Sequence, residues 1–133
     1  MVIDVQVLTP DRVICTTIAD VVVLPGLTGQ IGVLNGHAAL IASLDTGLLR
    51  IKLDQKWTPI IVCGGLVEVS KDVVTVLVND VEELFSVQLN EATNELKRAT
   101  SALESVENSK DRIEASIELK KAVARLEAID YLT

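Results

Sequence analysis

The sequence has very few aromatic residues: Trp57, Phe85 and Tyr131 are the only ones among 133 residues, or 2% of the chain. Without a set of aromatic side chains it has no platform on which single-stranded bases could stack. Positive charge is also short, with 12 Lys and Arg against 19 Asp and Glu and a formal net charge of -7. Because phosphate backbones are bound by Lys and Arg, both shortages disfavour nucleic acid as a partner.

Long apolar runs are absent as well. No stretch of about 18 apolar residues occurs, so the sequence predicts no membrane-spanning helix. The first residues, Met1 to Asp4, show neither the basic start of a signal peptide nor the Arg- and Ser-rich composition of a transit peptide. We therefore expect the protein either to be made in the compartment where it works or to be present here in its mature form.

Residues that carry out chemistry are equally scarce. Cys15 and Cys63 stand far apart without His or Cys neighbours at metal-binding spacing, and we expect both to be buried, reduced and structural. His37 is the only histidine, and no nucleophile motif accompanies it. The glycine-rich segment Gly26–Gly32 matches neither a dinucleotide-binding motif nor a P-loop. The sequence thus predicts no catalytic residues, no cofactor site and no metal site.

The N-terminal part of the chain alternates apolar and polar residues in short runs separated by Gly, Asp, Asn and Pro. This pattern, with about seven to ten short strands, is typical of an antiparallel β-sandwich or barrel. Segments long enough for helical crossovers are missing, so we expect antiparallel pairing. The clearest expected strands are Ile3–Val7, Arg12–Thr16, Val21–Leu24, Ala38–Leu44, Gly47–Leu53, Trp57–Cys63, Leu66–Val69 and Val73–Val78.

The apolar period changes near Phe85, and apolar residues then recur every third or fourth position, as in helices. The short linker around Asn108 and Ser109 predicts an antiparallel two-helix hairpin, with Ser109 as the expected N-cap of the second helix. We divide the chain into a β-sandwich domain, residues 1–85, and a helical hairpin domain, residues 86–133. The expected seam residues are Leu89, Ala92, Leu96, Ala99, Leu103 and Val106 on the first helix, and Ala115, Leu119, Ala122, Val123, Leu126 and Ile129 on the second.

This seam is rich in alanine, which allows close approach but buries little area, so two such helices alone would be marginally stable. We expect the hairpin to lean on the β domain, on a partner, or on each in turn. The second helix also carries Lys120, Lys121 and Arg125. Two interpretations stay open for these charges: an ordinary solvated helix face, or a basic stripe that docks on an acidic partner surface.

Several ordered motifs together resemble the epsilon subunit of F-type ATP synthases, in its chloroplast and cyanobacterial form. The similarity covers the whole chain, and its most specific element is Gly29-Gln-Ile-Gly-Val-Leu34 followed by Gly36-His-Ala38. Further matching stretches are Leu8–Arg12, Gly47–Ile51, Gly64-Gly65, Thr75–Asn79, Leu119–Ala122 and Ala124–Leu126.

The resemblance implies a flattened antiparallel β-sandwich followed by a C-terminal antiparallel two-helix hairpin. It implies a non-catalytic rotor subunit that joins the gamma subunit to the membrane c-ring, couples proton flow to ATP synthesis and inhibits ATP hydrolysis. Gln30 and His37 become candidate contacts with the c-ring. Lys120, Lys121 and Arg125 become candidate contacts with the alpha/beta catalytic head, which an extended hairpin would reach.

The same resemblance implies a peripheral position at the chloroplast thylakoid membrane, on the stromal side, or at the cytoplasmic side of a cyanobacterial thylakoid. One family motif is not matched: where some bacterial members bind ATP through an Asp and an Arg, this chain has Asn90 and Thr93. The residues themselves leave two other classes open. One is a free-standing adaptor whose hairpin docks on an unrelated partner, and the other is an enzyme with a pocket around His37 or Asp80.

Overall fold

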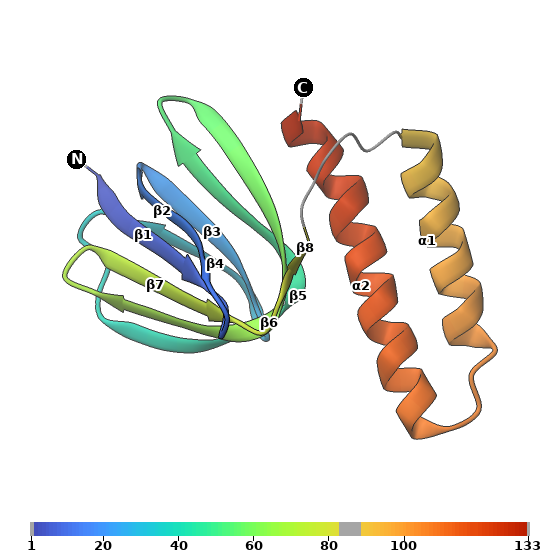
Figure 1. Cartoon of the computed structure of the whole chain (residues 1–133). Coiled ribbons are helices and arrows are strands. Elements are labelled where there is room, and N and C mark those ends of the chain that lie inside the picture. The colour runs from blue at the N-terminus through green and yellow to red at the C-terminus, as the bar shows by residue number, and fades with distance from the viewer. Residues whose placement is uncertain (1, 83–88, 133) are drawn as a thin grey trace.

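The computed structural model describes residues 2–82 and 89–132, which form eight strands and two helices (Figure 1). The expected domain boundary, at residues 83–87, lies outside the described residues. The elements are β1 (Ile3–Leu8), β2 (Val13–Ala19), β3 (Val21–Gly26), β4 (Gly29–Leu34), β5 (Leu40–Leu53), β6 (Lys56–Ser70), β7 (Val73–Val78), β8 (Val81–Glu82), α1 (Leu89–Glu104) and α2 (Ser109–Leu132).

The strands form a single hydrogen-bonded sheet that folds over itself into two layers. Its order is β2-β1-β7-β6-β5-β3-β4, and β8 adds to β6. β7 pairs with the C-terminal half of β6, whereas β8 pairs with its N-terminal half. The long strands β5 and β6 therefore run through both layers and hold the flattened sandwich together (Figure 1).

Three details differ from the expectation. Gly29–Leu34, which was not among the expected strands, forms β4. β1 pairs in parallel with β7, although its other pairing, with β2, is antiparallel. The segments Ala38–Leu44 and Gly47–Leu53, expected as two strands, merge into the single strand β5 of 14 residues. Likewise, Trp57–Cys63 and Leu66–Val69 merge into the single strand β6 of 15 residues. The reason lies at Gly64 and Gly65, whose φ angles of 71° and 143° let β6 bend without breaking its pairing with β5. At Gly65 a Cβ would collide with the backbone of Leu77.

The expected turns are confirmed. Asp54 and Gln55 connect β5 to β6 with φ angles of 51° and 65°, and Lys71 and Asp72 connect β6 to β7 with 51° and 63°. Two consecutive residues with positive φ are the geometry of the hairpin turns that match strand twist.

The core of the sandwich consists of the inward-facing residues of the strands. Ile3, Val5, Val22, Leu24 and Leu49 are at most 1% exposed, as are several further Val residues. Cys15 and Cys63 are free thiols, as expected, but each is only partly buried. Their burial nevertheless raises the pKa of both thiols. No helix among the described residues is both long enough and apolar enough to cross a bilayer.

The helices form the expected antiparallel hairpin, and α2 lies between the sandwich and α1 (Figure 1). Asn108 caps α2, since its Oδ1 accepts a 2.8 Å hydrogen bond from the amide of Asp111. The expected cap, Ser109, is instead the first helical residue. Within the expected seam Ala92 and Ala122 are buried, but Val123 is 37% exposed and lies outside it.

Candidate functional site

The second buried face of α2 is the first feature of the site, and it rests on the sandwich. Ala124 and Ala128 are 2% and 0% exposed and pack against Leu48 of β5 and Ile61 of β6. Sequence reasoning assigned α2 one apolar stripe and missed this face. The spacing of Ala124, Ala128 and Tyr131, four and then three residues, is the signal that could have found it. α2 is thus apolar on two sides because it is the middle layer between α1 and the sandwich.

Two basic residues of α2 form ion pairs across this contact. The Nζ of Lys120 lies 3.0 Å from Oδ1 of Asp45 on β5. Arg125 donates two hydrogen bonds of 2.5 Å, from Nε and Nη2, to the carboxylate of Glu82 on β8. Its Nη1 donates a third, 3.0 Å long, to Oε2 of Glu95 on α1. Arg125 therefore connects both helices and the sandwich.

The electrostatic environment of Arg125 fixes its charge. Its hydrogen bonds to Glu82 raise the pKa of the guanidinium further above its usual value, and burial opposes this only in part. The side chain is 21% exposed, so solvent screens these contacts less than it would screen a fully exposed pair.

Lys121, the third residue of the expected basic stripe, has a different ion-pair partner. Lys121 pairs with Glu118 on its own helix, at 3.6 Å. The structure thus brings Lys120 and Arg125 into the contact with the sandwich and leaves Lys121 paired within α2.

An aromatic and cationic cluster lies at the C-terminal end of α2. The guanidinium carbon of Arg50 lies 5.3 Å from the ring centre of Tyr131 and 5.7 Å from that of Trp57. The two rings meet edge to face, with centres 5.7 Å apart. Arg50 also donates hydrogen bonds to the hydroxyl of Tyr131 and, at 3.4 Å, to Oε1 of Gln30. Arg50 lies on the face of its strand that α2 covers, where it contacts Tyr131.

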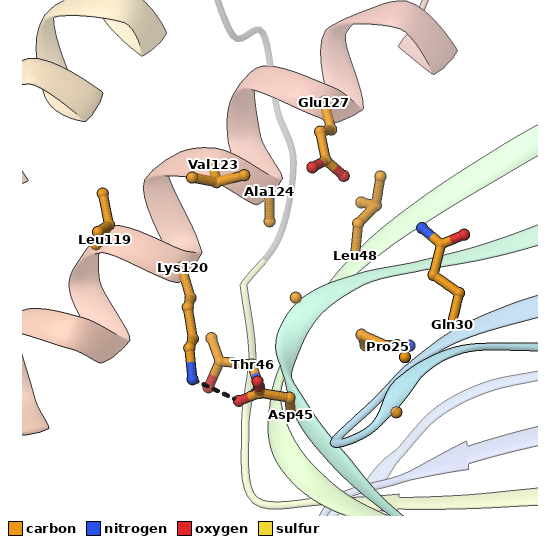
Figure 2. A pocket seen from close by; sticks show the side chains of 13 residues that line it. Pro25, Gln30, Asp45, Thr46, Leu48, Leu119, Lys120, Val123, Ala124 and Glu127 are labelled. Atoms are coloured by element: carbon orange, nitrogen blue, oxygen red, sulfur yellow. Dashed lines mark hydrogen bonds and ion pairs between the residues drawn. The ribbon is translucent and has the colours of Figure 1, made fainter.

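A cavity of about 370 Å³ opens beside this contact, between α2 and the turn that joins β3 to β4. Figure 2 shows Lys120 extending from α2 to Asp45 at its edge. The cavity has both apolar and charged walls, which include Pro25, Gln30, Leu48, Lys120, Val123 and Glu127.

The candidate c-ring residues lie at opposite ends of β4. Gln30 is next to the β3–β4 turn, opposite Pro25, and its side chain faces the hairpin cavity. His37 follows the other end of the strand, where its Nδ1 lies 2.6 Å from the carbonyl oxygen of Ala38. The neighbouring Gly36 amide donates a 2.7 Å hydrogen bond to Asp72. The structure therefore does not bring Gln30 and His37 together.

The contact between α2 and the sandwich has the groups needed for association of two surfaces. In residues 2–82 and 89–132, no group of three or more His, Cys, Asp or Glu side chains is placed to hold a metal ion. Lys120, Arg125 and Arg50 form ion pairs or hydrogen bonds across elements, and two of the apolar side chains that α2 contributes, Ala124 and Ala128, are small. Such a contact can hold two bodies together and let them separate, because each of its bonds can be exchanged with water or a partner.

Comparisons with known proteins give a consistent result. Residues 2–84 match the family described as "ATP synthase, Delta/Epsilon chain, beta-sandwich domain", and residues 89–130 match its "long alpha-helix domain". The chain is 70% identical over 133 residues to the "ATP synthase epsilon chain, chloroplastic" of Thalassiosira pseudonana, and 68% identical to that of Phaeodactylum tricornutum. Both alignments cover 100% of each chain.

Solved structures share the fold at lower identity. A chain of the Euglena gracilis mitochondrial ATP synthase aligns with a TM-score of 0.79 and 22% identity, over 96% of this chain and 81% of that one. A chain of the Tetrahymena thermophila mitochondrial ATP synthase, from its central stalk and c-ring, aligns with a TM-score of 0.60 and 14% identity, over 94% of each. The expected fold, a β-sandwich followed by two helices, is confirmed.

Proposed function

Because the chain belongs to the delta/epsilon chain family of ATP synthases, we propose that it is the non-catalytic epsilon subunit of a chloroplast ATP synthase. In this role it forms part of the central stalk, joins gamma to the c-ring and couples proton translocation to ATP synthesis. The identities of 70% and 68% to chloroplastic epsilon chains, each over the full length, support this proposal. It would lie at the stromal side of the thylakoid membrane, held there by the complex.

We assign the c-ring contact to the sandwich, with Gln30 and His37 as separate contact points. Their positions at opposite ends of β4 fit two contacts along one edge better than a single joint site. β4 is an end strand of the sheet, so this edge is not covered by another strand.

The hairpin would restrain ATP hydrolysis by extending toward the alpha/beta catalytic head with Lys120, Lys121 and Arg125. The observation that carries this part is the pairing of Lys120 with Asp45 and of Arg125 with Glu82. The same positive charges cannot neutralise the sandwich and the catalytic head at once. Docking and inhibition therefore compete for one set of residues, which makes the hairpin a two-state element.

This competition defines the experiment. ATP hydrolysis is measured in F1 that lacks its own epsilon subunit, with this chain added. Asp45→Asn with Glu82→Gln removes the sandwich partners but keeps the basic residues, and it should increase inhibition. Lys120→Ala, Lys121→Ala and Arg125→Ala together should weaken inhibition without weakening binding to gamma. The matched control is Lys97→Ala with Arg98→Ala, two exposed cations of α1.

Opposite shifts from the acidic and the basic variants would support the proposal. Full inhibition by the triple basic variant at low ionic strength would contradict it, because screening is weakest there and any electrostatic contact should be at its strongest.

A further inference from the structure

The cluster of Arg50, Trp57 and Tyr131 has no part in the function proposed above, yet it joins the last turn of the hairpin to the sandwich. We propose that these three side chains form a cation–aromatic clasp that sets the fraction of molecules in which the hairpin is docked. The proposal rests on the hairpin's part in the proposed function and deepens it, and the isolated chain is enough to test it.

The sandwich side of the clasp is held in place by contacts within the sandwich itself. Trp57 stands opposite Lys52 in the β5–β6 ladder, and the Nζ of Lys52 lies 5.7 Å from its ring centre. Arg50 is anchored on its other side by Gln30. A planar guanidinium fixed in this way can stack on an aromatic face and still donate hydrogen bonds, which an ammonium group does less well.

The hairpin side contributes Tyr131, which differs in size from the other residues that α2 packs on the sandwich. Ala124 and Ala128 each bury little more than a methyl group, and Lys120 forms an ion pair that is partly open to solvent. Aromatic side chains bury far more area and gain from edge-to-face contact and from a nearby cation. Within the described part of α2, Tyr131 therefore supplies the largest apolar contact with the sandwich.

The position of the clasp determines how the hairpin leaves. Tyr131 lies in the last turn of α2, beyond Ala128 and Ala124. Loss of the Tyr131 contact frees the C-terminal end first and leaves only small side chains and one or two ion pairs to hold the rest. The fraction of molecules with a docked hairpin then depends strongly on the contact of the Tyr131 ring.

The test uses the isolated full-length chain, with Trp57 as a natural reporter because it is the only tryptophan. Tyr131→Ala and Arg50→Gln should each shift Trp57 emission to longer wavelength and increase its quenching by acrylamide. Each should also enlarge the radius of gyration in solution X-ray scattering. From the usual strength of cation–aromatic contacts we expect the docked-to-undocked ratio to fall about five- to tenfold.

Two variants serve as controls. Tyr131→Phe keeps the ring over Arg50 and loses only the hydroxyl, so most of the docking should remain. Arg98→Gln removes one arginine from the exposed face of α1 and should change neither measurement. Far-ultraviolet circular dichroism confirms that each variant keeps its helices.

An unchanged radius of gyration in Tyr131→Ala would overturn the proposal, even if Trp57 emission shifted, since the contact would then be local only. If scattering changes but hydrolysis by F1 does not respond to the same variants, the clasp stands and the inhibitory part of the proposed function falls.

Discussion

At the scale of single residues, Arg125 does most to connect the parts of the molecule. It donates to Glu82 on the sandwich side and to Glu95 on α1, and its pKa is raised by the first of these contacts. Because the folded-state pKa lies above the unfolded one, the stabilisation is fully present below the unfolded pKa and would be lost only as the pH rises through the folded value. The arginine itself therefore introduces no pH switch under ordinary conditions.

Replacement of Arg125 by alanine should lower the free energy of unfolding by about 1–2 kcal/mol, since hydrogen bonds to charged groups are lost at a partly buried site. The helical signal in urea unfolding measures this change. Lys121→Ala is the control, because the ion pair that Lys121 forms among the described residues is with Glu118 on its own helix, and it should cost less than about 0.5 kcal/mol. Equal losses in the two variants would show that Arg125 does not connect the elements.

At the scale of elements, α2 is a helix with two buried faces of small side chains. Ala122 is buried in the seam expected between the helices, and Ala124 and Ala128 face the sandwich. Small side chains let a helix approach both neighbours closely. They also give little area to hold it there.

A larger side chain at this contact should therefore separate the layers. Ala128→Leu is expected to destabilise docking by about 1–3 kcal/mol, because the added carbons have no free space against Leu48 and Ile61. Solution scattering should report a larger radius of gyration, and Trp57 emission should shift to longer wavelength. Ala102→Leu on the exposed face of α1 tests for a general effect of leucine. A compact Ala128→Leu variant would mean that α2 is not close-packed on the sandwich.

The elements also show what the sequence can and cannot predict. Alternation and turn residues located most of the strands, since side-chain direction and turn geometry are local properties. They missed β4 (Gly29–Leu34), whose glycines were read as turn residues. The bend at Gly64-Gly65 and the parallel pairing of β1 depend on contacts between distant strands and could not be located in this way. The basic residues of α2 were found, but their partners were not, because Asp45 and Glu82 are 75 and 43 positions away. The cation–aromatic clasp was missed for the same reason.

At the scale of the whole molecule, stability is concentrated in the sandwich. Its main core is built from strand residues alone, whereas the contact with α2 is a separate small cluster of Leu48, Ile61, Ala124 and Ala128. Each layer of the sandwich covers the other, so the larger core does not depend on the helices.

A chain ended after Phe85 should therefore still fold. Thermal unfolding of residues 1–85 should remain cooperative, with a lower midpoint because Leu48 and Ile61 lose their cover. The fragment should still bind gamma but should no longer inhibit hydrolysis. Loss of cooperative unfolding would contradict both the expected boundary and the independence of the sandwich core.

The parallel pairing of β1 with β7 also sets the order in which the chain can assemble during synthesis. Asp4 lies beside Val73, and Leu8 lies beside Leu77. One side of β1 therefore has no partner strand until about 70 further residues have been made, a wait of roughly 3–14 s at about 5–20 residues per second. The helices emerge only after this strand has closed the sheet. The body of the protein is thus completed before the arm, and β1 has an edge open to wrong partners in the meantime.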